Sequence, residues 1–401
     1  MKSNQPWFVV LILAVVFGVG GDWPRFRGGD SNSIALDAKP PTELSEGNVA
    51  WKKELPGRGP SSPIVVDGKV LVTCSDGVKQ DRIYVVCFDV DSGDELWRRQ
   101  LWATGRTASH PTSANAAPTP ASDGEAIYAF YSSNDLACIE LDGTLRWYRG
   151  LAFDYPKAGN DIGMASSPVI VGDVVVVQIE NQGDSFATGI NCKTGKTIWR
   201  LDREPVANWS SPVPLTAVGS DAPSGVLLQS PSGLTAVDAA TGSVLWTHES
   251  GCDGTSSSVS RPGRIYFPSS DGITALDTTK REPETIWNAR RLRPGAASTI
   301  VDGNQVYAVN RSGVLTCASA VDGQQLWQQR LKGSFWGTPA IAAGHMYLVS
   351  QEGDLQIVKL SKDAAEVVSE FSLKEKIQGS IAIADNAIFI RSDAHLWKLA
   401  H

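Results

Sequence analysis

The sequence lacks several features that would point directly to a class of function. Charged residues are only 20% of its 401 residues, and the formal net charge is −7. No basic stripe is present that could follow a phosphate backbone, so a nucleic-acid partner is not expected. No long amphipathic helical pattern occurs, the five histidines are scattered along the chain, and no nucleophile-elbow sequence is found. The residues therefore offer no catalytic constellation.

The sequence also lacks an apolar run long enough to span a bilayer, which takes about 20 residues. The apolar run of residues 8–20 near the N-terminus is shorter than that. Val19 and Gly21 suit a cleavage site before Asp22, so residues 1–21 are predicted to be a secretory signal peptide. An uncleaved anchor is the alternative. We expect an exported protein, periplasmic or associated with the cell envelope, with no transmembrane domain after signal removal.

What the sequence does contain is a repeat of 40–52 residues. Each copy leads from a start rich in Ser, Ala or Gly through short strands to an aromatic residue. These residues are Trp51, Trp97, Trp147, Trp199, Trp246, Trp287, Trp327 and Phe371. Such a period is typical of a β-propeller with one blade per repeat. The prediction is an all-β fold, an eight-bladed β-propeller of four-stranded antiparallel blades over residues 49–401.

The copy that ends at Trp246 shows the repeat most clearly. Ala236 lies in a strand, Asp238 and Gly242 mark a turn, and Trp246 ends the next strand. Asp and Thr side chains hydrogen-bond the backbone of such a turn, and Gly supplies a positive φ. A Trp buried against the flanking blade removes roughly 150–250 Å² from water. The seven Trp residues of the repeat are therefore predicted to dock one blade on another.

The starts of the copies contain a second signal, a pair of small residues that is often followed by Pro. Small residues suit the crowded inner strand near the propeller axis, and Pro is tolerated at the first residue of a strand. The pairs are Ser62-Pro63, Ala117-Pro118, Ser167-Pro168, Ser211-Pro212, Ser257-Ser258, Ala297-Ser298, Thr338-Pro339 and Gly379-Ser380.

The two ends of the chain are expected to close the ring together. Trp51 comes before the first of these starts, whereas the last copy has no aromatic residue after its third strand, residues 395–399. Residues 49–55 should therefore supply the outer strand of the last blade, which removes the free sheet edges. Residues 22–48 would then form an N-terminal arm outside the ring.

The cysteines favour free thiols, although export permits disulfides. Cys87, Cys138 and Cys317 occupy one position in three different copies, and Ala236 and Ala275 occupy it in two others. A position that accepts Ala or Cys is a tight buried one, and equivalent positions in different blades are too far apart to bridge. The pairing of the remaining three, Cys74, Cys192 and Cys252, stays open.

The spacing Ala–x–Asp–x–x–Thr–Gly–x–x–x–Trp resembles the tryptophan-docking motif of the pyrroloquinoline quinone (PQQ)-like repeat family. Four copies fit it, and the resemblance covers most of the chain. The segment of residues 22–35 also resembles the start of mature exported members. The family includes eight-bladed quinoprotein dehydrogenases and non-catalytic propellers such as the outer-membrane assembly factor BamB. The resemblance thus implies either kind of protein.

If this chain were like the catalytic members of the family, the resemblance would imply three features. These are a pair of adjacent Cys residues, carboxylate and Asn ligands for Ca²⁺, and an Asp that acts as a base. No two Cys are adjacent here. Loop residues with oxygen ligands do occur, namely Asp161, Glu180, Asn181 and Asn208, but turns require the same residue types. We therefore predict a non-catalytic, monomeric, BamB-like scaffold for a protein or glycan partner, without cofactor or metal. The alternative is a PQQ- and calcium-dependent quinoprotein oxidoreductase that acts on alcohols or sugars.

Binding is expected on the face where the long links between blades emerge, because a rigid scaffold positions variable loops there. Trp209 and Trp336 lie outside the register of the docking Trp residues, so they can line a pocket or pack at the channel rim. The candidate binding residues are Arg106, His110, Tyr155, Lys157, Asn160, Asp161, Asn208, Trp209, Asp253, Arg293, Phe335 and Trp336.

Overall fold

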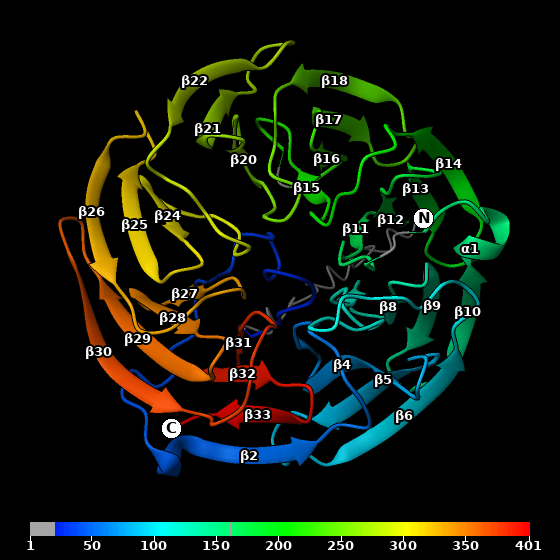
Figure 1. Cartoon of the computed structure of the whole chain (residues 1–401), viewed down its shortest axis with the longest axis horizontal. Coiled ribbons are helices and arrows are strands. Elements are labelled where there is room, and N and C mark those ends of the chain that lie inside the picture. Colours follow the sequence, from blue (N-terminus) through cyan, green and yellow to red (C-terminus); the bar gives the residue numbers. More distant parts are fainter. Residues whose placement is uncertain (1–20, 160–161, 221) are drawn as a thin grey trace, which may run out of the picture.

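Eight antiparallel sheets stand around a central axis in sequence order, as Figure 1 shows. This computed structural model describes residues 21–159, 162–220 and 222–401, so the predicted signal peptide lies outside the described residues except for Gly21. The prediction of an eight-bladed all-β propeller is confirmed. Within the described part of the chain, no helix is long and apolar enough to cross a membrane.

The blades are built from inner to outer strand, and each outer strand leads to the inner strand of the next blade. Blade 1 is β3–β6 (Ile64–Val66, Lys69–Asp76, Arg82–Asp89, Glu95–Trp102), and blade 2 is β7–β10 (Ala121–Ser122, Ala126–Phe130, Asp135–Glu140, Leu145–Gly150). Blade 3 is β11–β14 (Val169–Val171, Val174–Ile179, Phe186–Asn191, Thr197–Asp202), and blade 4 is β15–β18 (Val213–Leu215, Gly225–Ser230, Gly233–Asp238, Val244–Glu249).

Blade 5 is β19–β22 (Val259–Arg261, Arg264–Ser269, Gly272–Asp277, Glu284–Ala289), and blade 6 is β23–β26 (Ile300–Asp302, Gln305–Val309, Val314–Ser319, Gln325–Arg330). Blade 7 is β27–β30 (Ala340–Ala342, His345–Val349, Asp354–Leu360, Ala365–Ser372), and β1 (Ile34–Ala35) adds a parallel strand to it. A short helix, α1 (Leu151–Asp154), follows blade 2, and a 3-10 helix covers Glu46–Asn48.

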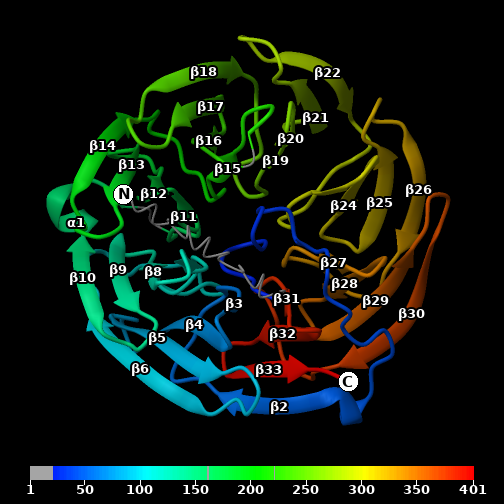
Figure 2. The same ribbon diagram turned by 180° about the vertical axis from the view of Figure 1, so that it is seen from behind.

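Blade 8 joins the two ends of the chain. Its inner three strands are β31–β33 (Ala382–Ala384, Ala387–Arg391, His395–Leu399), and its outer strand is β2 (Val49–Glu54). β2 pairs antiparallel with β33, as Figures 1 and 2 show in blue and red. The predicted closure by an N-terminal strand is therefore confirmed.

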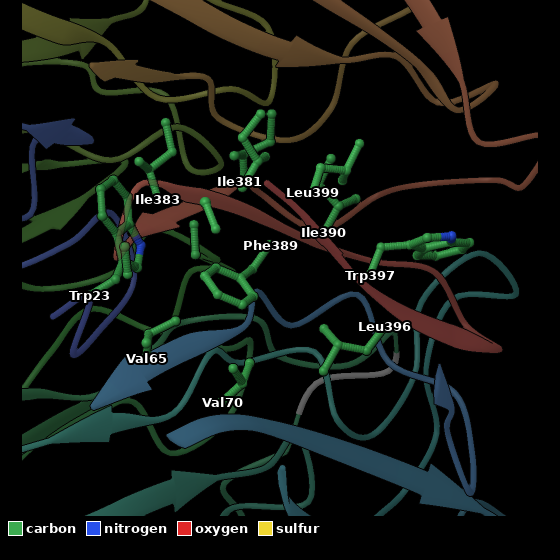
Figure 3. Packing of buried hydrophobic residues seen from close by; sticks show 14 of the residues in the cluster. Trp23, Val65, Val70, Ile381, Ile383, Phe389, Ile390, Leu396, Trp397 and Leu399 are labelled. Atoms are coloured by element: carbon green, nitrogen blue, oxygen red, sulfur yellow. The ribbon is translucent and has the colours of Figure 1, made fainter. Parts of the chain in front are cut away.

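The largest hydrophobic cluster lies at this closure. It joins blades 7, 8 and 1 with the N-terminal arm, and Figure 3 shows Trp23 of the arm beside Val65 of β3 and Ile383 of β31. Phe389 and Leu396 fill the space between the strands of blade 8 and blade 1. Burial of these side chains holds the first and last blades together in the absence of a covalent link.

Five of the Trp residues dock on the following blade through a specific contact with its turn glycine, namely Trp51, Trp97, Trp147, Trp199 and Trp287. Gly195 has φ +67°, and a Cβ there would lie 2.7 Å from the ring of Trp147 in the preceding blade. The Trp147 Nε1–H also donates to the Cys192 carbonyl at 2.8 Å. Trp51, Trp97, Trp199 and Trp287 make the same kind of indole hydrogen bond to the blade that follows. The glycine thus provides both the positive φ and the room for the indole.

The seventh copy departs from the expected position of its aromatic residue. In six other blades the Trp pairs with the small position of the neighbouring strand, as Trp246 does with Ala236. In blade 7 the residue in that place is Ser369, opposite Ile357, and Phe371 lies two residues further along. The Ser369 hydroxyl accepts a hydrogen bond from the Leu44 backbone N–H of the arm. The arm covers this outer strand where a docking indole would otherwise be needed.

All six cysteines are buried and free. This confirms the free state of the three cysteines in the repeat and settles that of Cys74, Cys192 and Cys252. Burial raises the pKa of the Cys87, Cys138 and Cys252 thiols to about 12. These thiols act as small apolar side chains of the core.

Candidate functional site

A closed ring of hydroxyl groups surrounds the propeller axis at the start of the inner strands. In each blade a Ser or Thr hydroxyl oxygen accepts a hydrogen bond from the backbone N–H of the equivalent residue in the preceding blade, at 2.9 or 3.0 Å. The ring runs through Ser62, Thr119, Ser167, Ser211, Ser257, Ser298, Thr338 and Ser380, and back to Ser62. All eight residues are buried. The ring is the reason why each copy starts with a small hydroxyl residue.

The ring corrects the sequence register of blade 2. We expected that blade to start at Ala117-Pro118, but Thr119 supplies its ring hydroxyl. Ala117 lies two residues earlier and lines the cavity described below. Two consecutive pairs of this kind, Ala117-Pro118 and Thr119-Pro120, occur in the sequence, and only the need for a hydroxyl distinguishes between them.

The N-terminal arm crosses the end of the channel beyond this ring, as the blue segment in Figures 1 and 2 shows. The Arg27 guanidinium is buried and donates to the carbonyls of Ser258 and Thr299 in blades 5 and 6. The arm also bonds to blades 1, 2, 3 and 7 through Val65, Ser122, Ile170 and Ile341. Burial lowers the pKa of Arg27 to about 9. The arm therefore lies against the channel opening rather than outside the ring.

A cavity of about 550 Å³ lies on the other side of the ring, on the loop-rich face. Phe26 of the arm forms part of its floor, and the eight ring residues form its lower wall. We call this cavity the bowl. It has the volume of a typical small-molecule site, about 300–1,000 Å³. The upper wall and rim include His110, Trp209, Arg311 and Trp336.

Three of the predicted binding residues line the bowl, and they come from different links between blades. These are His110, Trp209 and Trp336. The Trp209 Nε1–H donates to the Gly163 carbonyl at 2.8 Å, which holds this indole at the wall. The Nδ1 of His110 lies 2.8 Å from the Thr112 hydroxyl, and the imidazole is exposed. Trp209 and Trp336, two of the Trp residues outside the docking register, thus lie at the bowl.

Other predicted residues lie away from the bowl. Phe335 is buried in the core between blades 6 and 7, and the Tyr155 ring packs 4.6 Å from that of Phe186 near α1. The Asp253 carboxylate accepts hydrogen bonds from the backbone of its own turn. Arg106, Lys157 and Arg293 are exposed in their links and are not part of the lining, and Asn160 and Asp161 lie outside the described residues.

Asn208 is buried in a polar cluster with Glu180 and Arg203. The Arg203 Nε donates to one oxygen of the Glu180 carboxylate at 2.7 Å, and Asn208 Nδ2 donates to the other at 2.9 Å. Burial raises the pKa of Glu180, and the charge and hydrogen bond of Arg203 lower it again. Both carboxylate oxygens are therefore already paired.

Of the possible oxygen ligands for Ca²⁺, the three that the structure describes, Glu180, Asn181 and Asn208, already bond to protein groups. Arg203 occupies the cationic position beside Glu180, and the side chain of Asn181 bonds the backbone of Gly183 and Asp184. Among residues 21–159, 162–220 and 222–401, no group of three His, Cys, Asp or Glu lies close enough to hold a metal ion. The described donor set thus differs from what a hard cation requires.

Sequence reasoning missed Arg311, Gln351 and Gln378, which also line the bowl. Arg311 and Gln351 lie in tight turns between strands, where polar residues are common, so their sequence context carries no signal. Gln378 could have been found, because it lies two residues before ring residue Ser380, as Trp209 and Trp336 do before Ser211 and Thr338.

The fold and the ring of docked indoles define a PQQ-like repeat β-propeller. The sequence matches the family described as "Outer membrane protein assembly factor BamB" over residues 34–183, 157–266 and 269–368. The chain belongs to that family. No curated protein sequence gives a significant match.

Several solved structures resemble this one. BamB from Moraxella catarrhalis is 16% identical, with a TM-score of 0.65 over 88% of this chain and 97% of that chain. A europium-containing methanol dehydrogenase is 10% identical, with a TM-score of 0.72 over 95% and 98%. The quinohemoprotein alcohol dehydrogenase from Comamonas testosteroni is 13% identical, with a TM-score of 0.70 over 95% and 80%. At these identities the likeness concerns the fold alone.

Proposed function

We propose that this protein is an exported, non-catalytic scaffold whose bowl holds a protein or glycan partner. The observation that carries the proposal is the chemistry of the bowl. Its described lining offers hydroxyls, amides, two indoles, one guanidinium and one imidazole, but no carboxylate. Such a surface can hydrogen-bond and stack on a partner, whereas general acid–base chemistry usually needs a pair of titratable groups within reach of one another.

The family supports an envelope role for this scaffold, because its description names outer membrane protein assembly. In the proposal residues 1–21 are removed on export, residues 22–48 form the arm that closes the channel, and residues 49–401 form the propeller. The protein acts as a monomer in the periplasm or at the cell envelope. The arm makes the bowl a blind cavity, so a partner enters from the loop-rich face only.

The alternative is a PQQ- and calcium-dependent oxidoreductase, which the dehydrogenase structures favour by their fold. The residues of the bowl do not fit that group. The cation would need oxygen ligands, and the Glu180 carboxylate is already bonded to Arg203 and to Asn208. For this reason the scaffold is the primary proposal.

The proposal is tested by placing a photoreactive amino acid at position 336 of the full chain in intact cells. A cross-linked partner is expected at this position, and none at position 102, because Trp102 is 59% exposed on an outer strand away from the bowl. Equal cross-linking at both positions, or at position 102 alone, would contradict the bowl as the binding site.

A second measurement addresses catalysis. The purified chain is mixed with PQQ, Ca²⁺, a redox dye and a panel of alcohols and sugars. We expect no dye reduction above the level without protein. Dye reduction that requires PQQ and is lost in Trp209→Ala would contradict the scaffold proposal and support the oxidoreductase alternative.

A further inference from the structure

The bowl has a second tier of eight equivalent positions, two residues before each hydroxyl of the ring. All eight line the cavity: Pro60, Ala117, Ala165, Trp209, Thr255, Ala296, Trp336 and Gln378. The packing of the eight blades requires no large side chain at these positions, because four of them hold Ala or Pro. The two Trp residues break the repeat in blades 4 and 7. Neither lies at a docking position, and both line the bowl, where large aromatic side chains are typical binding residues.

A positively charged side chain lies beside the indole of Trp336. The Arg311 guanidinium lies 4.6 Å from the centre of the Trp336 ring, and Arg311 is exposed at the rim. Among the described residues, Arg311 forms no ion pair and no side-chain hydrogen bond. A guanidinium that stacks on an indole keeps its N–H edge available for a carboxylate or sulfate. Gln351 and Gln378 add amide groups in the neighbouring blades.

The lower wall of the bowl is rich in hydrogen-bond donors. Each hydroxyl oxygen of the ring accepts one backbone N–H, which leaves its own O–H to donate. No acceptor for these eight O–H groups is found among the residues that the structure describes. Arg25 and Arg27 flank Phe26 behind the floor, and the described lining has no carboxylate. Glu352, next to Gln351, accepts hydrogen bonds from Ser334 and is not part of the lining.

We propose that the bowl binds an anionic saccharide, a sugar chain that carries carboxylate or sulfate groups. This inference rests on the proposed scaffold function and names the class of its ligand. Pyranose rings present apolar C–H faces that stack on indoles, and their hydroxyls match a wall of hydroxyl and amide groups. Trp209 and Trp336 lie three blades apart, so they contact different sugar rings of one chain. Arg311 pairs with the acidic group of the ring at Trp336.

A saccharide fits these observations better than an acidic peptide does. Two separated indoles with hydroxyl groups between them match repeated flat rings, whereas a peptide chain would require acceptors for its backbone N–H groups. The described lining contains no carboxylate, the strongest acceptor for such N–H groups. An acidic peptide is therefore an outcome of the test rather than part of the proposal.

The experiment is calorimetric titration of the full purified chain with three oligosaccharides of equal length. The probes are an oligogalacturonate (carboxylate), a sulfated chondroitin fragment (sulfate) and a cello-oligosaccharide (neutral). At least one acidic probe is expected to bind at least tenfold more tightly than the neutral probe, and its affinity should fall as salt is raised. Whether the carboxylate or the sulfate probe binds more tightly identifies the acidic group.

Variants test whether the saccharide binds in the bowl or elsewhere on the surface. Arg311→Gln should weaken the acidic probe about tenfold, which is the loss of one charge-assisted hydrogen bond, and should leave a neutral probe within threefold. Arg311→Lys should restore part of the affinity. Trp336→Ala should weaken acidic binding by at least tenfold. The matched controls are Arg293→Gln and Trp102→Ala, which alter an exposed Arg and an exposed Trp outside the lining and should change nothing.

Two results would overturn the inference and leave the scaffold function standing. One is equal affinity for acidic and neutral probes, with Arg311→Gln behaving as the parent chain. The other is no saccharide binding, together with an acidic peptide or a protein that cross-links at position 336. Absence of any ligand or cross-link at the bowl would remove both the inference and the proposed function.

Discussion

Opening the hydroxyl ring at one position should cost measurable stability, and Ser211→Ala is the most direct way to open it. The Ser211 hydroxyl oxygen accepts the Ser167 backbone N–H at 2.9 Å, and both residues are buried. Alanine removes the acceptor but leaves the Ser211 N–H bonded to Ser257. The substitution therefore breaks one of the eight links and leaves the seven others in place.

The expected loss of stability follows from the Ser167 backbone N–H, which loses its acceptor in Ser211→Ala. A buried N–H without a partner costs about 1–3 kcal/mol. Because the bowl opens to solvent, a water molecule can partly replace the lost acceptor, so we expect about 1–2 kcal/mol. Ser211→Thr should stay within about 0.5 kcal/mol of the parent chain, since Thr119 and Thr338 already supply ring hydroxyls.

Urea unfolding of the two variants measures the free-energy difference, and hydrogen exchange reports the site of the damage. Exchange of the Ser167 amide should become about tenfold faster in Ser211→Ala, which corresponds to about 1.4 kcal/mol. Ser270→Ala, at an exposed position, is the control and should change neither quantity. The reasoning fails if Ser211→Ala unfolds like Ser211→Thr and the Ser167 amide keeps its protection.

Three further predictions follow from the blade contacts, the buried ion pair and the thiols. Gly195→Ala should lose about 1–3 kcal/mol more in urea unfolding than Gly303→Ala, because both have positive φ but only Gly195 faces an indole at 2.7 Å. Equal losses would contradict the docking contact. Arg203→Met should cost about 3–5 kcal/mol at pH 7, since the Glu180 carboxylate stays buried without its partner. Burial raises the pKa of Glu180, and loss of Arg203 raises it further, so protonation should return part of this stability between pH 7 and pH 5. A loss that is the same at both pH values would show that the charge is not the cause. Iodoacetamide should modify none of the six buried thiols at pH 7.5 in the native chain and all six in urea, as mass spectrometry would show. Native modification, or disulfide-linked peptides, would refute the assignment of inert free thiols.

The repeat period and the docking Trp residues were sufficient to predict the number of blades and the closure by β2. The candidate site was predicted less well. Trp209 and Trp336 were found because they stand in links between blades, outside the register of the seven docking Trp residues. Phe335 and Asn208 were chosen for their residue types in long links, but links between blades also carry core and turn residues. Exposure within a link is decided by packing, which residue type alone does not indicate.

The sequence by itself determined the repeating scaffold, because the copies encode local rules: small residues at the inner strand, in most copies a turn glycine, and an aromatic residue near the end of the outer strand. Only the tertiary structure decided what lies at the axis. Neighbouring hydroxyls of the ring are 40–57 residues apart, and the bond that closes it spans 318 positions, from Ser380 to Ser62. The arm, which no repeat describes, closes the channel through equally distant contacts, such as that between Ser33 and Ile341. Contacts between residues so distant in the chain depend on how the blades curve around the axis. No local pattern carries that information.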